Sequence, residues 1–90
     1  MYGEAERRTL LNLIQAIDKN QVLLSPDKSA PLKIVKLELW TQVAYSFNDI
    51  TGKNASIRKL SGILKRMKHN DIKFAKYLEY DKDTEKWIFL

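Results

Sequence analysis

Residues 46–70 hold a concentration of basic side chains that no other part of the chain shares. This segment has a net charge of +5, equal to the formal net charge of all 90 residues, and Asp49 is its one acidic residue. A basic surface of this kind is typical of proteins that bind a polyanion, because each neutralised phosphate releases condensed counterions. A solvated helix face is the alternative interpretation. The basic residues of the segment are Lys53, Arg58, Lys59, Lys65, Arg66 and Lys68.

Other kinds of chemistry find little support in the residue types. The chain has no cysteine, which excludes disulfides, thiolate zinc sites and thiol nucleophiles. His69 is the single histidine, and we interpret it as a surface residue of the basic segment. No carboxylate pair lies among apolar residues that would shift its pKa, and there is no glycine-rich phosphate loop. We therefore expect no enzyme activity, no cofactor, no metal and no small-molecule substrate.

Length and composition predict one small folded domain over residues 1–90. The chain is 44% hydrophobic and 30% charged, a balance typical of folded rather than disordered proteins. Its uninterrupted apolar runs are too short to cross a bilayer, and its first residues lack the apolar stretch of a signal peptide. We expect a soluble intracellular module with no membrane partner.

Apolar residues at helical spacing predict two helices before the basic segment. The first covers residues 4–19, with Asn20 as a candidate cap, and the second covers residues 37–49. Residues 21–31 contain Pro26 and Pro31 and are expected to form a loop, because proline interrupts a continuing helix. Residues 32–36 fit either a short strand or the start of the second helix. The second helix places these apolar residues on one side: Leu37, Trp40, Val43, Ala44 and Phe47.

The basic segment itself predicts a third helix over residues 55–69, with Asn54 or Ser56 as its N-cap. Spacing at 100° per residue places Arg58, Gly62, Lys65 and His69 opposite the apolar stripe, with Arg66 beside them. A glycine inside a helix costs about 1 kcal/mol relative to alanine, so Gly62 calls for a reason. Close approach of the helix backbone to DNA is one explanation, and simple tolerance of glycine is the other. Across the three helices we expect one shared core of Leu10, Leu13, Ile14, Ile17, Trp40, Val43, Phe47, Leu60, Leu64 and Met67.

The last part of the chain predicts a β-hairpin over residues 77–90. Aromatic and branched residues flank the polar tetrapeptide 81–84, a pattern typical of strand, turn and strand. A short fourth helix over 72–80 is the alternative. Tyr45 and Tyr80 are expected to be partly buried. The hairpin is similar to the wing of a winged-helix protein, but four carboxylates would repel phosphate, so we expect Tyr77, Trp87 and Phe89 to pack on the helices. Those acidic residues are Glu79, Asp81, Asp83 and Glu85.

The order and spacing of these residues resemble a known family over residues 5–70. The motif comprises Leu10-Leu11-xx-Ile14, Lys36-xxx-Trp40-xx-Val43-Ala44-xx-Phe47-Asn48, Arg58-Lys59-Leu60 and Leu64-Lys65-xx-Lys68. It is similar to the Myb/SANT-like modules of insect transcription regulators of the zeste and Apontic type, in which a tryptophan-containing helix ending in Phe-Asn precedes a basic third helix. The chain departs from them in three respects. It lacks the usual tryptophan of the first helix, it has Leu64 where an aromatic residue is common, and it adds the hairpin.

The resemblance implies a mainly α, three-helix helix-turn-helix bundle with a small C-terminal β-hairpin. It further implies a nuclear, DNA-binding module of a transcription or chromatin regulator, with the third helix as recognition element. The alternative is a protein-interaction or oligomerisation adaptor, as a homodimer or with an acidic protein partner. DNA binding requires Arg58, Lys65 and Arg66 to face solvent unpaired, whereas neutralisation by Asp49 or the hairpin would favour the adaptor. The residues expected to contact duplex DNA are Lys53, Asn54, Ser56, Arg58, Lys59, Gly62, Lys65, Arg66, Lys68 and His69.

Overall fold

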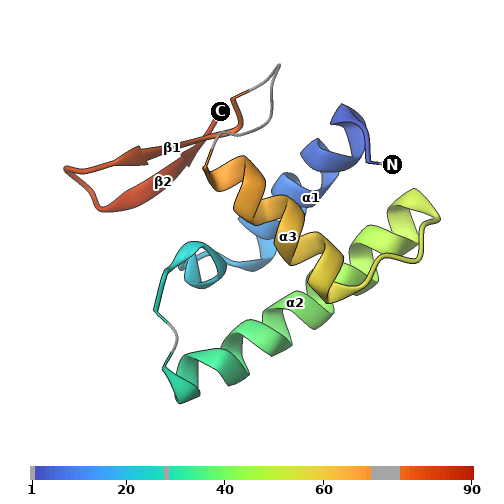
Figure 1. The fold of residues 1–90 in the computed structure, drawn as a ribbon, viewed down its shortest axis with the longest axis horizontal. Helices are drawn as coiled ribbons and strands as arrows, with labels where there is room; N and C mark the ends of the chain where they lie inside the picture. The colour runs from blue at the N-terminus through green and yellow to red at the C-terminus, as the bar shows by residue number, and fades with distance from the viewer. Residues whose placement is uncertain (1, 28, 70–75) are drawn as a thin grey trace.

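Three helices pack together and a two-stranded hairpin follows them, in a computed structural model that describes residues 2–27, 29–69 and 76–90 (Figure 1). The mainly α fold with a C-terminal antiparallel hairpin is therefore confirmed. Figure 1 shows α3 crossing in front of α1, with α2 below and the hairpin beyond the C-terminal end of α3. The elements are α1 (Glu4–Ile17), the 3-10 turn η1 (Val22–Leu24), α2 (Ala30–Thr51), α3 (Ile57–Lys68), β1 (Leu78–Asp81) and β2 (Lys86–Phe89).

The first helix ends at Ile17, earlier than the predicted residue 19, because Asp18 redirects the chain. The Asp18 carboxylate is buried and accepts hydrogen bonds from the backbone N–H of Val22 at 2.9 Å and of Leu23 at 2.8 Å. These bonds satisfy the carboxylate and cap the start of η1, as aspartate does at many helix N-termini. Asp18, and not Asn20, therefore ends α1.

The second helix begins at Ala30, well before the predicted residue 37. Ser29 is its N-cap, and Pro31 lies in its first turn, where the missing N–H of proline removes no helical hydrogen bond. Residues 32–36, for which a strand was the alternative, are therefore helical. At the other end Gly52 adopts the left-handed conformation (φ 70°) that terminates α2 after Thr51.

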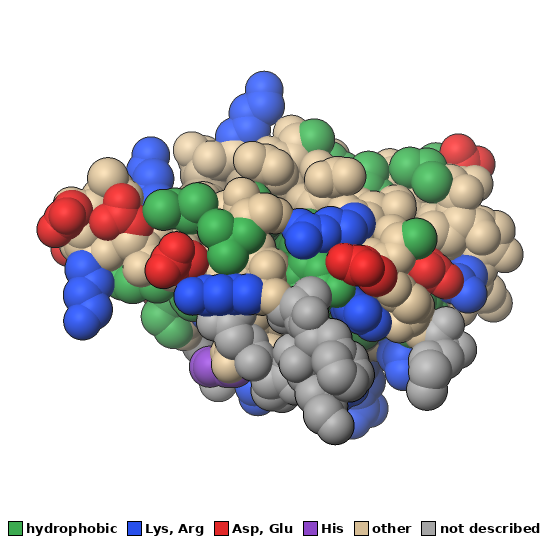
Figure 2. All heavy atoms as spheres, turned by 90° about the horizontal axis from the view of Figure 1, so that it is seen from above, with side chains coloured by type: hydrophobic (Ala, Val, Ile, Leu, Met, Phe, Trp, Pro, Cys, Tyr) green, Lys and Arg blue, Asp and Glu red, His purple; other side chains and the backbone are tan. Residues whose placement is uncertain are grey.

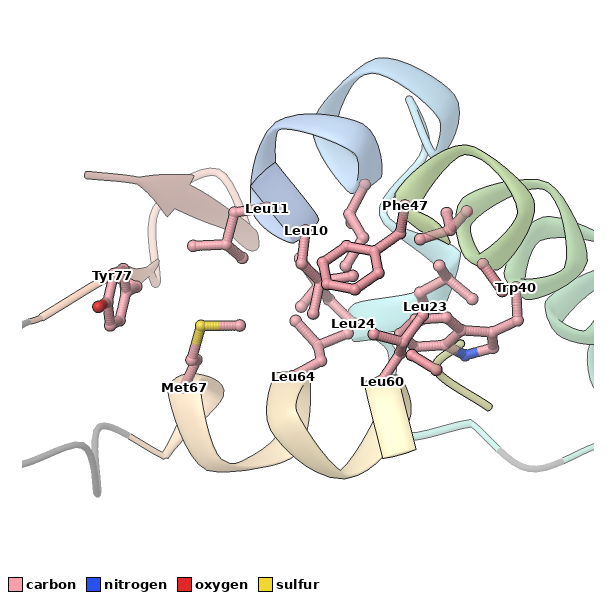
Figure 3. Packing of buried hydrophobic residues seen from close by; sticks show 14 of the residues in the cluster. Leu10, Leu11, Leu23, Leu24, Trp40, Phe47, Leu60, Leu64, Met67 and Tyr77 are labelled. Carbon is pink, nitrogen blue, oxygen red and sulfur yellow. The ribbon is translucent and has the colours of Figure 1, made fainter. Parts of the chain in front are cut away.

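The core lies where the three helices and η1 meet (Figure 3). Trp40 is 7% exposed, and Phe47, Leu60 and Leu64 are buried in the same cluster. All ten residues expected in the core lie in it or pack against it, with Leu13 and Ile17 at its edge. Leu37 was expected on the apolar side of the second helix, but it is 59% exposed because it faces away from α1 and α3.

The hairpin completes this core. β1 and β2 are antiparallel, and Tyr80 pairs with Trp87. Tyr77 is buried just before β1, close to Met67 of α3 in Figure 3, and Trp87 and Phe89 pack against the core, as predicted. The alternative helix over 72–80 is wrong for residues 78–80, which form β1, and its residues 72–75 lie outside the described part.

Two tyrosines expected to be partly buried are instead exposed. Tyr45 is 78% exposed on the outer side of α2, and Tyr80 is 45% exposed at the hairpin. Tyr80 stacks edge-on against Trp87, with ring centroids 5.2 Å apart. The hydrophobic spacing that buries Val43 and Phe47 leaves no inward position for Tyr45, because a helix turns about 100° per residue.

Candidate nucleic-acid interface

The turn between α2 and α3 is fixed by one amide side chain. Asn48 Nδ2 donates to the Ala55 carbonyl at 3.0 Å, and the Ala55 N–H donates to Asn48 Oδ1 at 2.8 Å. Thr51 adds a hydrogen bond to the Phe47 carbonyl at 2.7 Å. Side-chain bonds of this kind replace the backbone partners that residues of a turn lack. The entry of α3 is therefore set by the last turn of α2.

Ser56 begins α3 as its N-cap, and the helix then separates an apolar side from a basic side. The Ser56 hydroxyl accepts a hydrogen bond from the Lys59 N–H at 3.1 Å. The buried side consists of Leu60, Leu64 and Met67. Asn54, two residues before the N-cap, is exposed and does not cap the helix. Ser56 thus has a structural role in addition to the DNA contact expected of it.

Arg58 and Lys65 project from the side of α3 opposite the core. Both are exposed, and within residues 2–27, 29–69 and 76–90 neither side chain forms an ion pair or a hydrogen bond. Arg66 is exposed as well, but it has an interaction within the protein. DNA binding requires Arg58, Lys65 and Arg66 to be available. In the described structure, Arg58 and Lys65 meet this requirement.

A shallow depression lies on this basic side and includes Gly62 among its lining residues. A Cβ atom added at Gly62 would meet, beyond its own turn of the helix, no atom of the described residues within 4 Å, so packing against them does not require glycine here. The depression brings together hydroxyl, guanidinium and ammonium groups around exposed helix backbone. Its lining residues are Ser56, Arg58, Lys59, Gly62, Ile63 and Arg66.

Lys53 and Lys59 are held near the N-terminal end of α3 by Tyr2. Their ammonium groups lie 5.3 Å and 5.5 Å from the centroid of the Tyr2 ring, within cation–π range. Lys53 also pairs with Glu6 at 3.6 Å. The pKa of Glu6 lies below its ordinary value, first because its own backbone N–H donates to the carboxylate and then because Lys53 lies beside it. No local sequence pattern predicts these contacts, because they join the start of α3 to the first residues of the chain.

Lys68 lies on a different flank of α3 from Arg58. Its ammonium donates to the Leu24 carbonyl and sits 5.5 Å from the centroid of the Trp87 ring. Burial, followed by repulsion from Lys36, lowers the pKa of Lys68 below its ordinary value. His69 is exposed at the C-cap. The structure therefore divides the predicted site residues between two flanks of the helix.

The acidic residues of the hairpin gather away from the exposed side of α3. Figure 2 shows their carboxylates at the left end of the molecule, where the hairpin turn lies. Asp81 accepts a hydrogen bond from the Asp83 N–H at 2.9 Å, which lowers the pKa of Asp81, and the Thr84 hydroxyl lowers it further. In the described part of the chain, neither these carboxylates nor Asp49 forms an ion pair with Arg58 or Lys65.

Among the helices of the described residues, none combines the length and the apolar composition needed to cross a bilayer. In comparisons with family models, with curated proteins and with solved structures, nothing matches this chain. The Myb/SANT-like resemblance therefore rests on the residues of its motif alone.

Proposed function

We propose that this chain binds duplex DNA through the exposed side of α3, as the helix-turn-helix module of a nuclear transcription or chromatin regulator. The observation that carries the proposal is the availability of Arg58 and Lys65, both exposed and without a side-chain partner in the described structure. In Figure 1 no described element lies in front of α3. The basic side of the helix is thus open to a large, rigid ligand.

The dimensions of α3 suit the major groove. An α-helix with its side chains is about 10–12 Å across, and the major groove of B-DNA is about 12 Å wide. Arg58 is suited to paired hydrogen bonds with O6 and N7 of guanine, whereas Lys65 is suited to a phosphate. Because Gly62 presents bare backbone between them, the helix can approach the base edges without a side chain in the way.

Lys53 and Lys59 extend the basic surface toward the start of α3. Their positions beside Tyr2 restrict the motion of two long side chains, which lowers the conformational entropy lost on binding a phosphate. In this arrangement Arg58 reads a base, and the residues that bind the sugar–phosphate backbone include Lys53, Lys59 and Lys65. Phosphate contacts fix the register of the helix, and base contacts give the sequence preference.

The test is an anisotropy titration of a labelled duplex against the chain and two triple variants of equal charge. The first variant combines Arg58→Ala, Lys65→Ala and Arg66→Ala. The control combines Lys19→Ala, Lys33→Ala and Lys82→Ala, three exposed lysines outside α3. We expect the first variant to lose DNA binding and the control to retain most of it. Equal losses in both variants, or no binding at low salt, would replace this proposal with the adaptor function.

A further inference from the structure

A second groove runs along the other flank of α3, between this helix, the segment after η1 and the first half of α2. Its floor is apolar and is formed by Leu23, Trp40 and Leu64, one from each of η1, α2 and α3. Figure 3 shows these three side chains converging from their separate elements. Arg58, Gly62 and Arg66, which line the depression on the basic side, do not line this groove.

The rim of the groove is basic. Lys36, Lys65, Lys68 and His69 line it, and among the described residues that line it none is acidic. Asp27, in the loop between η1 and α2, does not line the groove, and its carboxylate accepts a hydrogen bond from the Ser29 N–H at 2.9 Å. Positive charge therefore surrounds an apolar floor, with no counter-charge supplied by the part of the groove that the structure describes.

Backbone carbonyls hold two of these ammonium groups in place without neutralising them. Lys36 donates to the carbonyls of Ser25 at 2.9 Å and Asp27 at 2.7 Å, and Lys68 donates to the carbonyl of Leu24. Because a lysine ammonium has three donors, each retains a donor for a ligand. The repulsion that lowers the pKa of Lys68 comes from Lys36, so an anion bound between them would relieve it.

We infer that this groove binds an acidic peptide segment of a partner protein. Carboxylates of the segment pair with Lys36, Lys65 and Lys68, and one apolar side chain covers the floor at Trp40. An apolar centre inside a charged rim is the usual arrangement of a protein-binding site. The sugar–phosphate backbone of a duplex has no apolar side chain to insert between these lysines, so phosphate binding here would leave the apolar floor uncovered. The groove adjoins the DNA-binding side of α3 and shares Lys65 with it, whereas Arg58 and Gly62 do not line the groove. The inference does not depend on the proposed DNA binding, because Lys36, Lys68 and the apolar floor lie outside that side.

The probe is a fluorescein-labelled synthetic peptide of aspartates and glutamates around one Leu-Phe pair. Lys36→Gln is compared with Lys33→Gln, because both remove one positive charge from α2 and Lys33 does not line the groove. We expect Lys36→Gln to weaken peptide binding about tenfold, as for one lost charge-assisted hydrogen bond, and Lys33→Gln to change it little. A peptide with Ala-Ala in place of Leu-Phe is expected to bind more weakly to the unaltered chain.

A gain of affinity separates this effect from misfolding. Ser61 is exposed and lines the groove, so Ser61→Lys adds a cation to the rim, and Gln42→Lys adds one on the outer side of α2. We expect only Ser61→Lys to tighten peptide binding, by about threefold, as for one added surface ion pair. Equal effects within either matched pair would overturn the inference. The inference would also be overturned if Lys36→Gln lost affinity for a duplex but bound the peptide as tightly as the unaltered chain.

Discussion

Gln21 binds both backbone polar groups of Trp87, across 66 residues of sequence. Its Nε2 donates to the Trp87 carbonyl at 2.7 Å, and its Oε1 accepts from the Trp87 N–H, also at 2.7 Å. The side-chain amide thus occupies the edge of β2 that faces away from β1, where a neighbouring strand would otherwise pair. Gln21 is held for this role in a left-handed backbone conformation (φ 56°), directly before η1.

We expect Gln21→Ala to lower the free energy of unfolding by about 1–3 kcal/mol, because two half-buried backbone groups lose their partner. Alanine and glutamine bear a similar cost at positive φ, so the change reports on the hydrogen bonds. The measurement is urea denaturation followed by far-UV circular dichroism. Gln42→Ala, at an exposed position of α2, serves as control and should stay within about 0.5 kcal/mol of the parent. Equal stability of the two variants would contradict this role of Gln21.

The helices, the core and the hairpin could be predicted because local periodicity determines them. Leu60, Leu64 and Met67 follow one another at helical spacing, and burial follows from that spacing. The start of α2 could not be predicted in the same way, since Pro31 is compatible with both a loop and a first helical turn. The sequence pattern did not predict that Asp18 ends α1. The Asp18 carboxylate does so by accepting hydrogen bonds from the N–H groups of Val22 and Leu23, and helical periodicity does not reveal such bonds.

The candidate site was predictable only in part, for a related reason. The exposure of Arg58 and Lys65 follows from their angle to the apolar stripe. Contacts between distant segments leave no such trace in the sequence. The position of Lys59 beside Tyr2 and that of Lys68 beside Trp87 depend on how α1 and the hairpin pack against α3. A helical projection gives the direction of a side chain but not its neighbours.

Trp40 is the most informative position for testing the core. It is 7% exposed and contributes a large aromatic side chain where α2 meets η1 and α3. We expect Trp40→Ala to reduce the free energy of unfolding by about 3–5 kcal/mol, the range for deleting a large buried aromatic side chain. Tyr45→Ala removes a comparable side chain from the exposed side of α2 and should change stability by less than about 0.5 kcal/mol. A thermal melt of each variant against the parent measures the difference.

Removal of residues 77–90 is expected to abolish cooperative unfolding. Tyr77 and Leu78 are buried, and Arg7 Nε donates to the Tyr77 hydroxyl at 2.9 Å, so the cut exposes apolar surface of α1 and α3. A small domain has little stability in reserve against such a loss. Ile88→Ala changes the hairpin at a side chain that is 45% exposed and should keep the transition cooperative. A truncated chain that melts cooperatively at the parent temperature would refute this prediction.

Gly62→Ala is expected to stabilise the protein by up to about 1 kcal/mol, because alanine is the better helix former and the added methyl group would meet no other segment of the described chain within 4 Å. Thermal denaturation measures the gain. The same variant resolves why the glycine is there. A lower affinity for duplex DNA despite higher stability would show that the backbone approaches the ligand closely. An unchanged affinity would show that glycine is merely tolerated.

Salt dependence gives the most direct test of the DNA-binding side of α3. Four to six phosphate contacts predict a slope of log affinity against log salt of about −4 to −5, since each contact contributes about −0.9.

Lys65→Ala should weaken binding to all duplexes alike and flatten the slope by about one unit, because a lysine bound to phosphate carries no sequence information. Arg58→Ala should instead cost about 1–3 kcal/mol on a preferred duplex and relax the preference at one base pair. Both variants are titrated by anisotropy at about 50 mM and about 200 mM salt. Since Arg58 and Lys65 have no side-chain hydrogen bond or ion pair in the described structure, neither substitution removes such an interaction there, and a loss of binding reports on the DNA. Parallel slopes for the parent and Lys65→Ala would exclude a phosphate contact at Lys65.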